Sequence, residues 1–505
     1  MTEWDGLEPK PERLDRLTLR GAPRDVALID KAGTLDFAGL DAAVGKLAAA
    51  LSRQAGRGDR VASWLPKTRL ACLMVLACAR AGLVHVPVNP LLRRAQVTHI
   101  LADSGARLFV TQPARAALLE EGDLPEGCTL LLEADLAEPA DAPLPPSEGA
   151  ADELVALLYT SGSTGRPKGV MLSHANLWLG AISVAHYLRL APDDRTLAVL
   201  PLSFDAGLNQ LLSTWAAGAS VVPLDYLAAA EVVRAVERHG VTTLAGVPPL
   251  WIQLSEVNWP AETAAKLRRL SATGGRMPVP VVRRLRGIFP EADLYLMYGL
   301  TEAFRSTYLD PALVDAHPES IGRGIPFAEV LVARPDGSLT DDDEPGELVH
   351  AGPLVAQGYW RDAERTALRF RAAPPASRFG GTAVWSGDAV VRGADGLLRF
   401  VGRDDEMIKV SGNRISPTEI EEAAIASGAV AEAVALGVPD ERMGQAIRLV
   451  ARSAGGEDAE GRLVAYFKAQ MPNFQQPREV VWVDDLPRNP NGKLDRVRVR
   501  EEHGA

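Results

Sequence analysis

One glycine-rich stretch, residues 160–169, constrains the fold of this chain more than any other. The residues before it, 154–159, are continuously apolar and predict a buried strand. After it, Ser173 is a suitable N-cap for a helix. The stretch itself holds three glycines and four hydroxyl-bearing residues. A flexible Gly/Ser linker would not be flanked by a buried strand and a capped helix, so we predict a structured loop.

The composition of this loop suits a polyphosphate. Glycines let the backbone curl until several N–H groups converge on one anion, and the hydroxyls and Lys168 add further donors. The Walker A pattern is absent from the sequence, because no Gly-Lys-Ser/Thr triplet opens the helix. The loop therefore predicts a phosphate-binding site of a different type.

Length, charge and cysteine content exclude several functional classes. With 505 residues, 47% of them hydrophobic, the chain is long enough for more than one domain. A net charge of −11 disfavours a nucleic-acid partner, which needs a clustered basic face. The polar N-terminus lacks the apolar core of a secretion signal, and we expect no membrane span. Three cysteines without metal-site spacing predict reduced thiols and a cytoplasmic protein.

Alternating apolar strands and amphipathic helices predict an α/β fold with mixed or parallel sheets. Beyond about residue 322, short strands and Gly/Pro turns predict a small β-barrel or sheet subdomain. Helix and strand patterns after Asp405 predict a compact α+β module. The expected domains are a large N-terminal domain, residues 1–404, with a β subdomain at about 322–404, and a small C-terminal domain, residues 405–505.

Seven stretches between Tyr159 and Lys493 resemble, in the same order, the motifs of the adenylate-forming ligase superfamily. This superfamily contains acyl-CoA synthetases, adenylation domains of nonribosomal peptide synthetases and firefly-type luciferases. Residues 298–309, YGLTEAFRSTYL, are most similar to an exosortase-associated acyl-CoA-ligase-like branch. Near relatives of that branch are free-standing enzymes that load amino acids onto carrier proteins. The resemblance implies a small, mobile C-terminal lid domain.

The resemblance also implies that the glycine-rich loop binds the phosphates of ATP. In such a reaction a carboxylate attacks the α-phosphorus, so the site must supply cations and oriented dipoles to two anions that repel. Glu302, which follows Thr301 at the end of a predicted strand, is the implied Mg²⁺ ligand, and both residues are assigned to catalysis. The implied phosphate-binding residues are Thr160, Ser161, Gly162, Ser163, Thr164, Gly165 and Lys168.

A second set of residues is expected to bind the nucleoside. Two adjacent glycines after a strand allow the backbone to approach a flat ring, and a tyrosine can stack on that ring. A carboxylate suits two ribose hydroxyls, because it has two acceptor oxygens and no donor. The residues assigned to adenine and ribose are Gly274, Gly275, Arg276, Tyr298, Asp388 and Arg403.

The resemblance places further functions in and near the C-terminal domain. Lys493 is the implied catalytic lysine, which bridges the substrate carboxylate and ATP in the first step. Asp405 is the implied hinge about which the domain rotates before the second step. The rotation brings in residues 409–414 and opens a tunnel for a thiol, with Gly412 and Arg414 as its expected wall.

The sequence is compatible with two functions of Asp205. Typical acyl-CoA synthetases read Pro-Leu-Phe-His here, whereas this chain has Phe204 followed by Asp205. Amino-acid-adenylating domains share the Phe-Asp pair, and there the aspartate binds the α-ammonium of the substrate. A substrate ammonium would also offset the burial of an otherwise unpaired carboxylate. Alternatively, Asp205 caps the following helix. The residues assigned to the acyl or amino substrate are Phe204, Asp205, Met297 and Gly299.

We therefore predict an ATP-dependent ligase that adenylates a carboxylic acid, possibly an amino acid, and releases pyrophosphate and then AMP. The acceptor is a phosphopantetheine thiol of coenzyme A or of a carrier protein. One alternative is a conventional acyl-CoA synthetase for a fatty or aryl acid. A luciferase-like oxidative enzyme is a weaker alternative. A binding protein built on this fold would be expected to lose Lys168, Glu302, Asp388 or Lys493, and all four are present.

Overall fold

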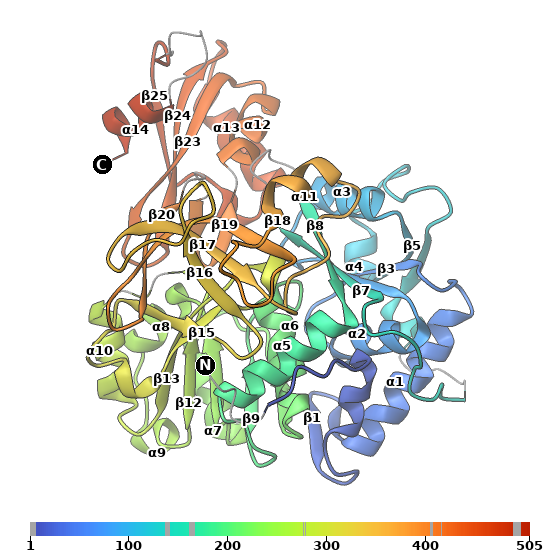
Figure 1. The fold of residues 1–505 in the computed structure, drawn as a ribbon. Helices are drawn as coiled ribbons and strands as arrows, with labels where there is room; N and C mark the ends of the chain where they lie inside the picture. The colour runs from blue at the N-terminus through green and yellow to red at the C-terminus, as the bar shows by residue number, and fades with distance from the viewer. Residues whose placement is uncertain are drawn as a thin grey trace.

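The computed structural model describes residues 7–136, 142–160, 167–275, 277, 279–403, 408–415, 417–487 and 496–504. Three β-sheets with their covering helices form a large N-terminal part and a smaller C-terminal module, which lies at the top of Figure 1. The predicted α/β fold is confirmed. Within the described ranges, no helix combines the length and the apolar character needed to cross a membrane.

The glycine-rich loop belongs to a six-stranded sheet with the order β6-β5-β3-β4-β7-β8. All neighbouring pairs are parallel except the last, in which the chain returns antiparallel to the strand that precedes the loop. The sequence did not predict this returning strand. The strands are β3 (Arg60–Trp64), β4 (Val84–Pro87), β5 (Ala106–Thr111), β6 (Thr129–Leu132), β7 (Leu154–Thr160) and β8 (Lys168–Ser173).

Both faces of β7 are buried, which explains why this strand is a continuous apolar run. Leu157 of β7 packs in the core beneath α3, whereas its neighbour Leu158 packs in the core formed with α1 and α2. Side-chain oxygens of Asp36 and Thr68 accept hydrogen bonds from the first turns of α1 and α2. The helices of this region are α1 (Phe37–Ser52), α2 (Arg69–Ala81), α3 (Arg94–Ser104) and α4 (Pro113–Ala116).

A 14-stranded sheet forms the rest of the N-terminal part, and its middle strands β9 to β13 are parallel to one another. The strands of the expected β subdomain continue this sheet beyond β14, in the order β14-β15-β20-β19-β17-β16. The strands are β1 (Val26–Asp30), β2 (Gly33–Asp36), β9 (Arg195–Ala198), β10 (Ser220–Pro223), β11 (Thr243–Gly246), β12 (Arg269–Ala272), β13 (Asp293–Tyr298), β14 (Thr307–Leu309), β15 (Ser320–Gly324), β16 (Glu329–Ala333), β17 (Pro345–Ala351), β18 (Phe370–Ala372), β19 (Thr382–Arg392) and β20 (Leu398–Arg403).

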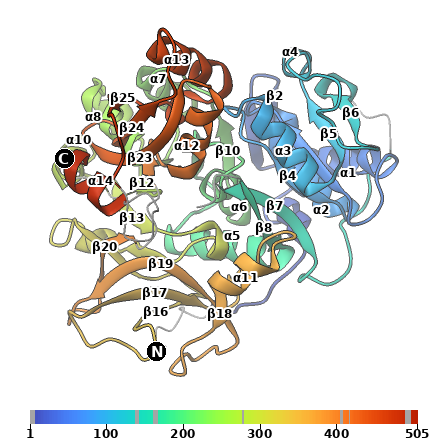
Figure 2. The ribbon, with the colours of Figure 1, turned by 90° about the horizontal axis from the view of Figure 1, so that it is seen from above.

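Two packed helices, α5 and α6, lie near the centre of the molecule in Figure 2 and share one core with the six-stranded sheet. Ser173 is the N-cap of α5, as predicted, and its hydroxyl accepts a hydrogen bond of 3.1 Å from the backbone N–H of Asn176. The helices of this part are α5 (His174–Tyr187), α6 (Asp205–Ala216), α7 (Ala229–His239), α8 (Pro248–Glu256), α9 (Ala261–Ala264), α10 (Val279–Ile288) and α11 (Ala363–Arg369).

The C-terminal module has a five-stranded sheet and a hydrophobic core of its own. The expected hinge residue, Asp405, lies outside the described residues. The elements of the module are β21 (Ile408–Val410), β22 (Asn413–Ile415), α12 (Pro417–Ala426), β23 (Val430–Asp440), β24 (Gly444–Ser453), α13 (Ala459–Gln470), β25 (Glu479–Trp482) and α14 (Arg496–His503).

A buried amide links this module to the N-terminal part. Nε2 of Gln96, on α3, donates hydrogen bonds to Oε1 of Glu419 at 2.9 Å and to Oε1 of Gln475 at 2.8 Å. All three side chains are buried, and Arg93 N–H donates to the remaining oxygen of Gln96. These bonds therefore help to define one orientation of the module.

Candidate active site

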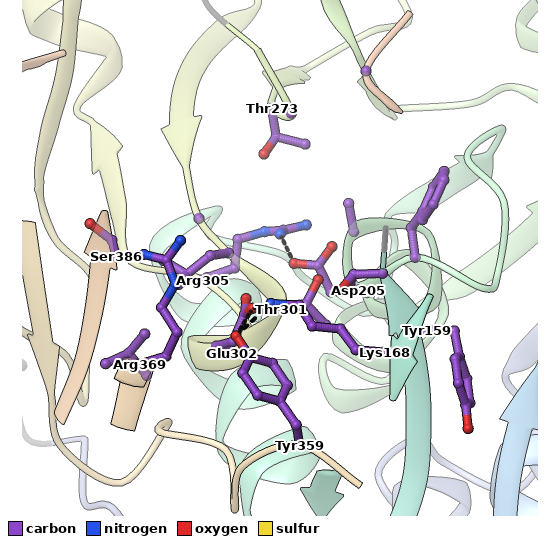
Figure 3. A pocket seen from close by; sticks show the side chains of 18 of the residues that line it. Tyr159, Lys168, Asp205, Thr273, Thr301, Glu302, Arg305, Tyr359, Arg369 and Ser386 are labelled. Carbon is purple, nitrogen blue, oxygen red and sulfur yellow. Dashed lines mark hydrogen bonds and ion pairs between the residues drawn. The ribbon is translucent and has the colours of Figure 1, made fainter. Parts of the chain in front are cut away.

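A cavity of about 440 Å³ lies where the predicted motifs meet (Figure 3). Its wall includes residues from both large sheets and from the C-terminal module, so segments far apart in the sequence contribute to one site. Predicted site residues that line it are Thr160, Lys168, Phe204, Asp205, Gly274, Gly299, Thr301, Glu302 and Gly412.

Lys168, Tyr359 and Glu302 form a connected group in this wall (Figure 3). Nζ of Lys168 donates to the hydroxyl of Tyr359 at 2.7 Å, and this hydroxyl donates to Oε1 of Glu302 at 2.7 Å. The same Nζ lies 3.4 Å from Oε1 of Glu302 and 3.9 Å from the centre of the Tyr359 ring. The lysine charge is therefore held beside the cavity, where an anionic ligand can reach it.

Thr160 ends β7 at the cavity, and its buried hydroxyl has no hydrogen-bond partner among the described residues. Next to it, Tyr159 donates a 2.5 Å hydrogen bond to Asp103; burial and this bond raise the pKa of the tyrosine, so its phenol stays neutral. An unpaired hydroxyl and a nearby lysine fit a phosphate group. Ser161, Gly162, Ser163, Thr164 and Gly165 lie outside the described residues.

The residues of this wall also fit Mg²⁺ bound together with a nucleotide. Among the described residues, no group of three or more His, Cys, Asp or Glu side chains could form a metal cage. Mg²⁺ at phosphoryl-transfer sites commonly uses one or two carboxylates together with substrate phosphates and water. Glu302 supplies such a carboxylate at the cavity, on the short 3₁₀ turn η3 (Thr301–Ala303).

Two of the residues assigned to adenine and ribose, Tyr298 and Asp388, are hydrogen-bonded to each other, and a third, Gly274, lines the cavity. The hydroxyl of Tyr298 donates a 2.5 Å hydrogen bond to Oδ2 of Asp388, which is only 3% exposed. Arg403 is the cross-strand partner of Asp388, although its side chain is outside the description. Gly274 has φ +79°, a conformation that favours glycine. Gly275 follows it and lies against Pro248, while Arg276 is outside the described residues.

Asp205 forms an ion pair with Arg305 in the cavity wall (Figure 3). Nη1 of Arg305 lies 2.8 Å from Oδ2 of Asp205, and the two side chains are 4% and 15% exposed. The idea that this carboxylate is unpaired is therefore wrong. Asp205 also does not cap α6, because the N-cap is Phe204 and no side chain caps that terminus. The aspartate instead compensates a buried arginine.

The backbone between Glu302 and Arg305 is strained. Phe304 has φ +59° and ψ −43°, which is rare for a bulky residue. Its ring packs against Gly180 of α5, where an added Cβ would lie only 2.2 Å from a ring carbon. This close contact between α5 and the turn holds Glu302 and Arg305 on the cavity side.

The C-terminal module contributes Gly412 to the cavity. Gly412 has φ +79°, and a Cβ there would lie 2.5 Å from Cγ1 of Val247. The glycine loops of the two parts also meet, because a Cβ on Gly274 would lie 3.6 Å from the carbonyl oxygen of Gly412. The loop that carries Gly412, which is expected at the thiol tunnel, therefore packs against Val247 and Gly274 of the N-terminal part. The side chain of Arg414 and all of Lys493 lie outside the description.

A second, smaller cavity of about 30 Å³ adjoins the first, and we call it the side chamber. It lies between α5, α6 and strands β11 to β13, and both cavities share Leu200, Ala206, Thr273 and Arg305. Met297 lines this chamber, and its sulfur accepts a hydrogen bond of 2.9 Å from Tyr187. Met297 and Gly299 therefore lie at different cavities, although only one residue separates them.

Sequence reasoning missed Arg305 and Tyr359, and neither carries a strong local signal. Arg305 lies within a run that was compared with known branches but was given no function. Tyr359 stands between Gly358, with φ +113°, and Trp360. Both residues form hydrogen bonds with partners that are 100 and 191 positions away, respectively.

Two family models match most of the chain. The AMP-binding enzyme model matches residues 16–360, and the AMP-binding enzyme C-terminal domain model matches residues 419–493. The chain is 33% identical to a feruloyl-CoA synthase of Amycolatopsis sp., over 99% of both proteins. It is also 33% identical to an L-proline–[L-prolyl-carrier protein] ligase of Streptomyces coelicolor, over 88% of this chain and 87% of that protein.

Solved structures of o-succinylbenzoate CoA synthetase from Bacillus subtilis share the fold at 26% identity. A double mutant bound to the product analogue OSB-NCoA gives a TM-score of 0.85, covering 97% of this chain and 98% of that one. The same enzyme in complex with the acyl-adenylate intermediate OSB-AMP gives 0.70 over the same shares.

Proposed function

This chain belongs to the AMP-binding enzyme family, and from that premise we propose that it activates a carboxylic acid without an α-ammonium group and transfers the acyl group to coenzyme A. The general activity of the chain is that of an ATP-dependent, AMP-forming acid–thiol ligase, which uses ATP, Mg²⁺ and a phosphopantetheine thiol. The nature of the acid and the choice of acceptor are the proposed parts.

The ion pair between Asp205 and Arg305 carries the proposal about the acid. Its two charges already compensate each other inside the wall, at 2.8 Å. A substrate ammonium beside Asp205 would also lie beside the guanidinium of Arg305, leaving a net positive charge in a largely buried site. A neutral acyl group meets no such cost.

We assign the chemical functions as the sequence predicts them. The glycine-rich loop and Lys168 hold the phosphates of ATP, and Glu302 binds Mg²⁺, which neutralises charge on the phosphates when bound. Gly274, Tyr298 and Asp388 hold the nucleoside. Lys493 acts in adenylate formation, with Asp405 as the pivot. The unpaired hydroxyl of Thr160 and the position of Lys168 at the cavity support this assignment.

The docked position of Gly412 supports a second step in which a thiol attacks the acyl-adenylate. The B. subtilis synthetase resembles this chain more closely with its CoA product analogue bound than with its adenylate, by TM-scores of 0.85 and 0.70. Both comparisons have 26% identity, so the difference reflects the arrangement of parts. We infer that the orientation described here is the one for thioester formation.

Coenzyme A is the proposed acceptor because the feruloyl-CoA synthase aligns over 99% of both chains. A second candidate function is the loading of an amino acid onto a carrier protein. It is favoured by the similarity to the prolyl-carrier ligase and by the position of Asp205 at the cavity.

The test is hydroxamate trapping with ATP and Mg²⁺, using pairs of acids that differ only in the amino group, such as phenylalanine and 3-phenylpropanoate. Thioester formation is then measured with coenzyme A and, separately, with a phosphopantetheinylated carrier protein. We expect the des-amino acids to be activated and coenzyme A to be acylated. Activation of the amino acids alone, or acylation of the carrier protein alone, would establish the second candidate instead.

A further inference from the structure

The side chamber adjoins the cavity in which the proposed acid would be activated. The two spaces share four residues of their walls, including Ala206 and Arg305. The chamber is therefore in the right place to receive the far end of an acyl group bound in the main cavity. The far end of the substrate must suit the side chains there.

Besides Nε of Arg305, three oxygen atoms of those side chains are buried and have no hydrogen-bond partner in the described part of the chain. They are Oδ1 of Asn209, Oγ1 of Thr243 and Oγ of Ser271. They come from α6, β11 and β12, and the two strands are neighbours in register, with Ala245 opposite Ser271. Another hydroxyl of this wall is satisfied, because Thr214 bonds to Thr196 at 2.7 Å and to the carbonyl of Gln210 at 2.6 Å.

Unpaired polar atoms destabilise a protein interior, and most buried polar atoms have partners. Three such oxygens and one such nitrogen around one chamber indicate that a ligand supplies the missing hydrogen bonds. Asn209 offers an acceptor, while Thr243 and Ser271 offer groups that can donate or accept. A hydroxyl meets both requirements, because it donates to the amide oxygen and accepts from a side-chain hydroxyl.

The charges around the chamber favour a neutral group. Arg305 is the one charged residue in the described lining of the chamber, and Asp205 compensates it at 2.8 Å. An added ammonium would be repelled by the guanidinium, and an added carboxylate would lie close to Asp205. The volume of about 30 Å³ matches a group of hydroxyl size rather than a long chain. The amide of Gln210 closes one side through a 3.1 Å bond to the N–H of Leu200.

We infer that the acid activated by this enzyme is compact and carries a hydroxyl at the end remote from its carboxylate, and that Asn209, Thr243 and Ser271 select for it. This inference rests on the proposed function, since it assigns a substrate class to the same site. It assigns these three residues to specificity, not to the chemistry of adenylate formation.

The test is ATP–pyrophosphate exchange with matched acids that differ in one hydroxyl. The probes are benzoate and cinnamate with their 3- and 4-hydroxy derivatives, and hexanoate with 6-hydroxyhexanoate. For the best hydroxylated acid, we expect kcat/KM at least about 10-fold higher than for its deoxy partner. In the variant that combines Asn209→Leu, Thr243→Val and Ser271→Ala, the preference should reverse, because the chamber is then apolar.

The variant is expected to fold, since it replaces unpaired polar groups with apolar groups of similar size. Thr214→Val is the matched control: its hydroxyl is already paired, so the hydroxy-to-deoxy ratio should stay as in the wild type. Equal or better activation of every deoxy acid, or a ratio that the triple variant leaves unchanged, would overturn the inference while the ligase function stands. Failure of every acid, amino acids included, to support exchange would overturn the proposed function as well.

Discussion

Nη1 of Arg305 lies 2.8 Å from Oδ2 of Asp205, and this contact connects two motif segments that are 100 residues apart. Asp205 begins α6, whereas Arg305 follows the turn that carries Glu302. The pair therefore fixes the wall of the acyl site to the turn that is proposed to hold Mg²⁺. Because Arg305 is only 4% exposed, the aspartate has a structural function before any substrate arrives.

Replacing Asp205 should destabilise the protein. Asp205→Ala leaves the buried charge of Arg305 without its partner, which typically costs about 3–5 kcal/mol in the free energy of unfolding. The double variant Asp205→Ala/Arg305→Met removes both charges and should recover much of that loss. Thermal unfolding of the three proteins measures the effect. An Asp205→Ala variant with an unchanged melting temperature would show that the ion pair contributes little and would favour a function in substrate binding.

Gly412→Ala should suppress thioester formation and spare adenylate formation. A Cβ at this position would lie 2.5 Å from Val247, so the loop could not dock as it does here. The residue also has φ +79°, which adds strain for alanine. The measurement is the rate of each half-reaction, with supplied acyl-adenylate for the second.

Gly428→Ala is the matched control for Gly412→Ala. Gly428 lies in the same module at φ +70°, but a Cβ there meets nothing within 4 Å. Both variants therefore carry the same backbone cost, and only one carries the clash. Equal loss of thioester formation in the two variants would contradict the docking argument.

Tyr359→Phe should slow adenylate formation by about 10- to 100-fold, the range expected for a hydrogen bond to a charged group. The lost hydroxyl bonds to Lys168 and to Glu302, both at 2.7 Å, so neither charged group would keep this positioning contact. Pyrophosphate exchange measures the effect. Tyr466→Phe, on α13 of the C-terminal module, is the control and should leave exchange unchanged.

The sequence predicted the parts of the site that depend on local patterns. The buried strand before the glycine-rich loop and the N-cap Ser173 are both confirmed, because apolar runs and capping residues are determined by their immediate neighbours. The predicted strand ahead of Glu302 is likewise present, as β13. Motif order then placed Thr160, Gly274 and Gly412 at one cavity.

Contacts between segments that are distant in the chain could not be predicted from the sequence. The partner of Asp205 is determined by how the turn after β13 packs on α5, and that packing depends on a strained Phe304. Tyr359 reaches Lys168 across 191 residues. A pattern of periodicity or capping contains no information about such pairs. The same holds for unpaired hydroxyls, which become apparent only when every possible partner has a position.

Gly180→Ala should reduce adenylate formation through the strained turn. The added Cβ would lie 2.2 Å from a ring carbon of Phe304, so the turn bearing Glu302 must move. Gly287→Ala is the control, because Gly287 lies in α10 and a Cβ there meets nothing within 4 Å. Alanine at that helical position should stabilise slightly. Pyrophosphate exchange and melting temperature separate the two effects, and a fully active Gly180→Ala enzyme would show that the turn tolerates displacement.

Acidification should destabilise the protein through His174. This buried side chain accepts a 3.1 Å hydrogen bond from the N–H of Leu14, and burial lowers the pKa of the histidine from 6.5 to about 3. The unfolded chain therefore binds one more proton than the folded chain between these values, so stability is complete above pH 6.5 and is lost as the pH falls toward 3. This one group should contribute a slope of about 1.4 kcal/mol per pH unit in that window.

The contribution of His174 can be isolated by substitution. His85 and His350 are also buried, and burial lowers the pKa of each to about 3, so the wild-type slope includes all three residues. His174→Asn removes one titrating group and leaves the other two. Urea unfolding at several values between pH 7 and 5 should therefore show a shallower dependence in the variant, by about one proton. Parallel curves for the two proteins would mean that His174 takes up its proton equally well in the folded and unfolded states.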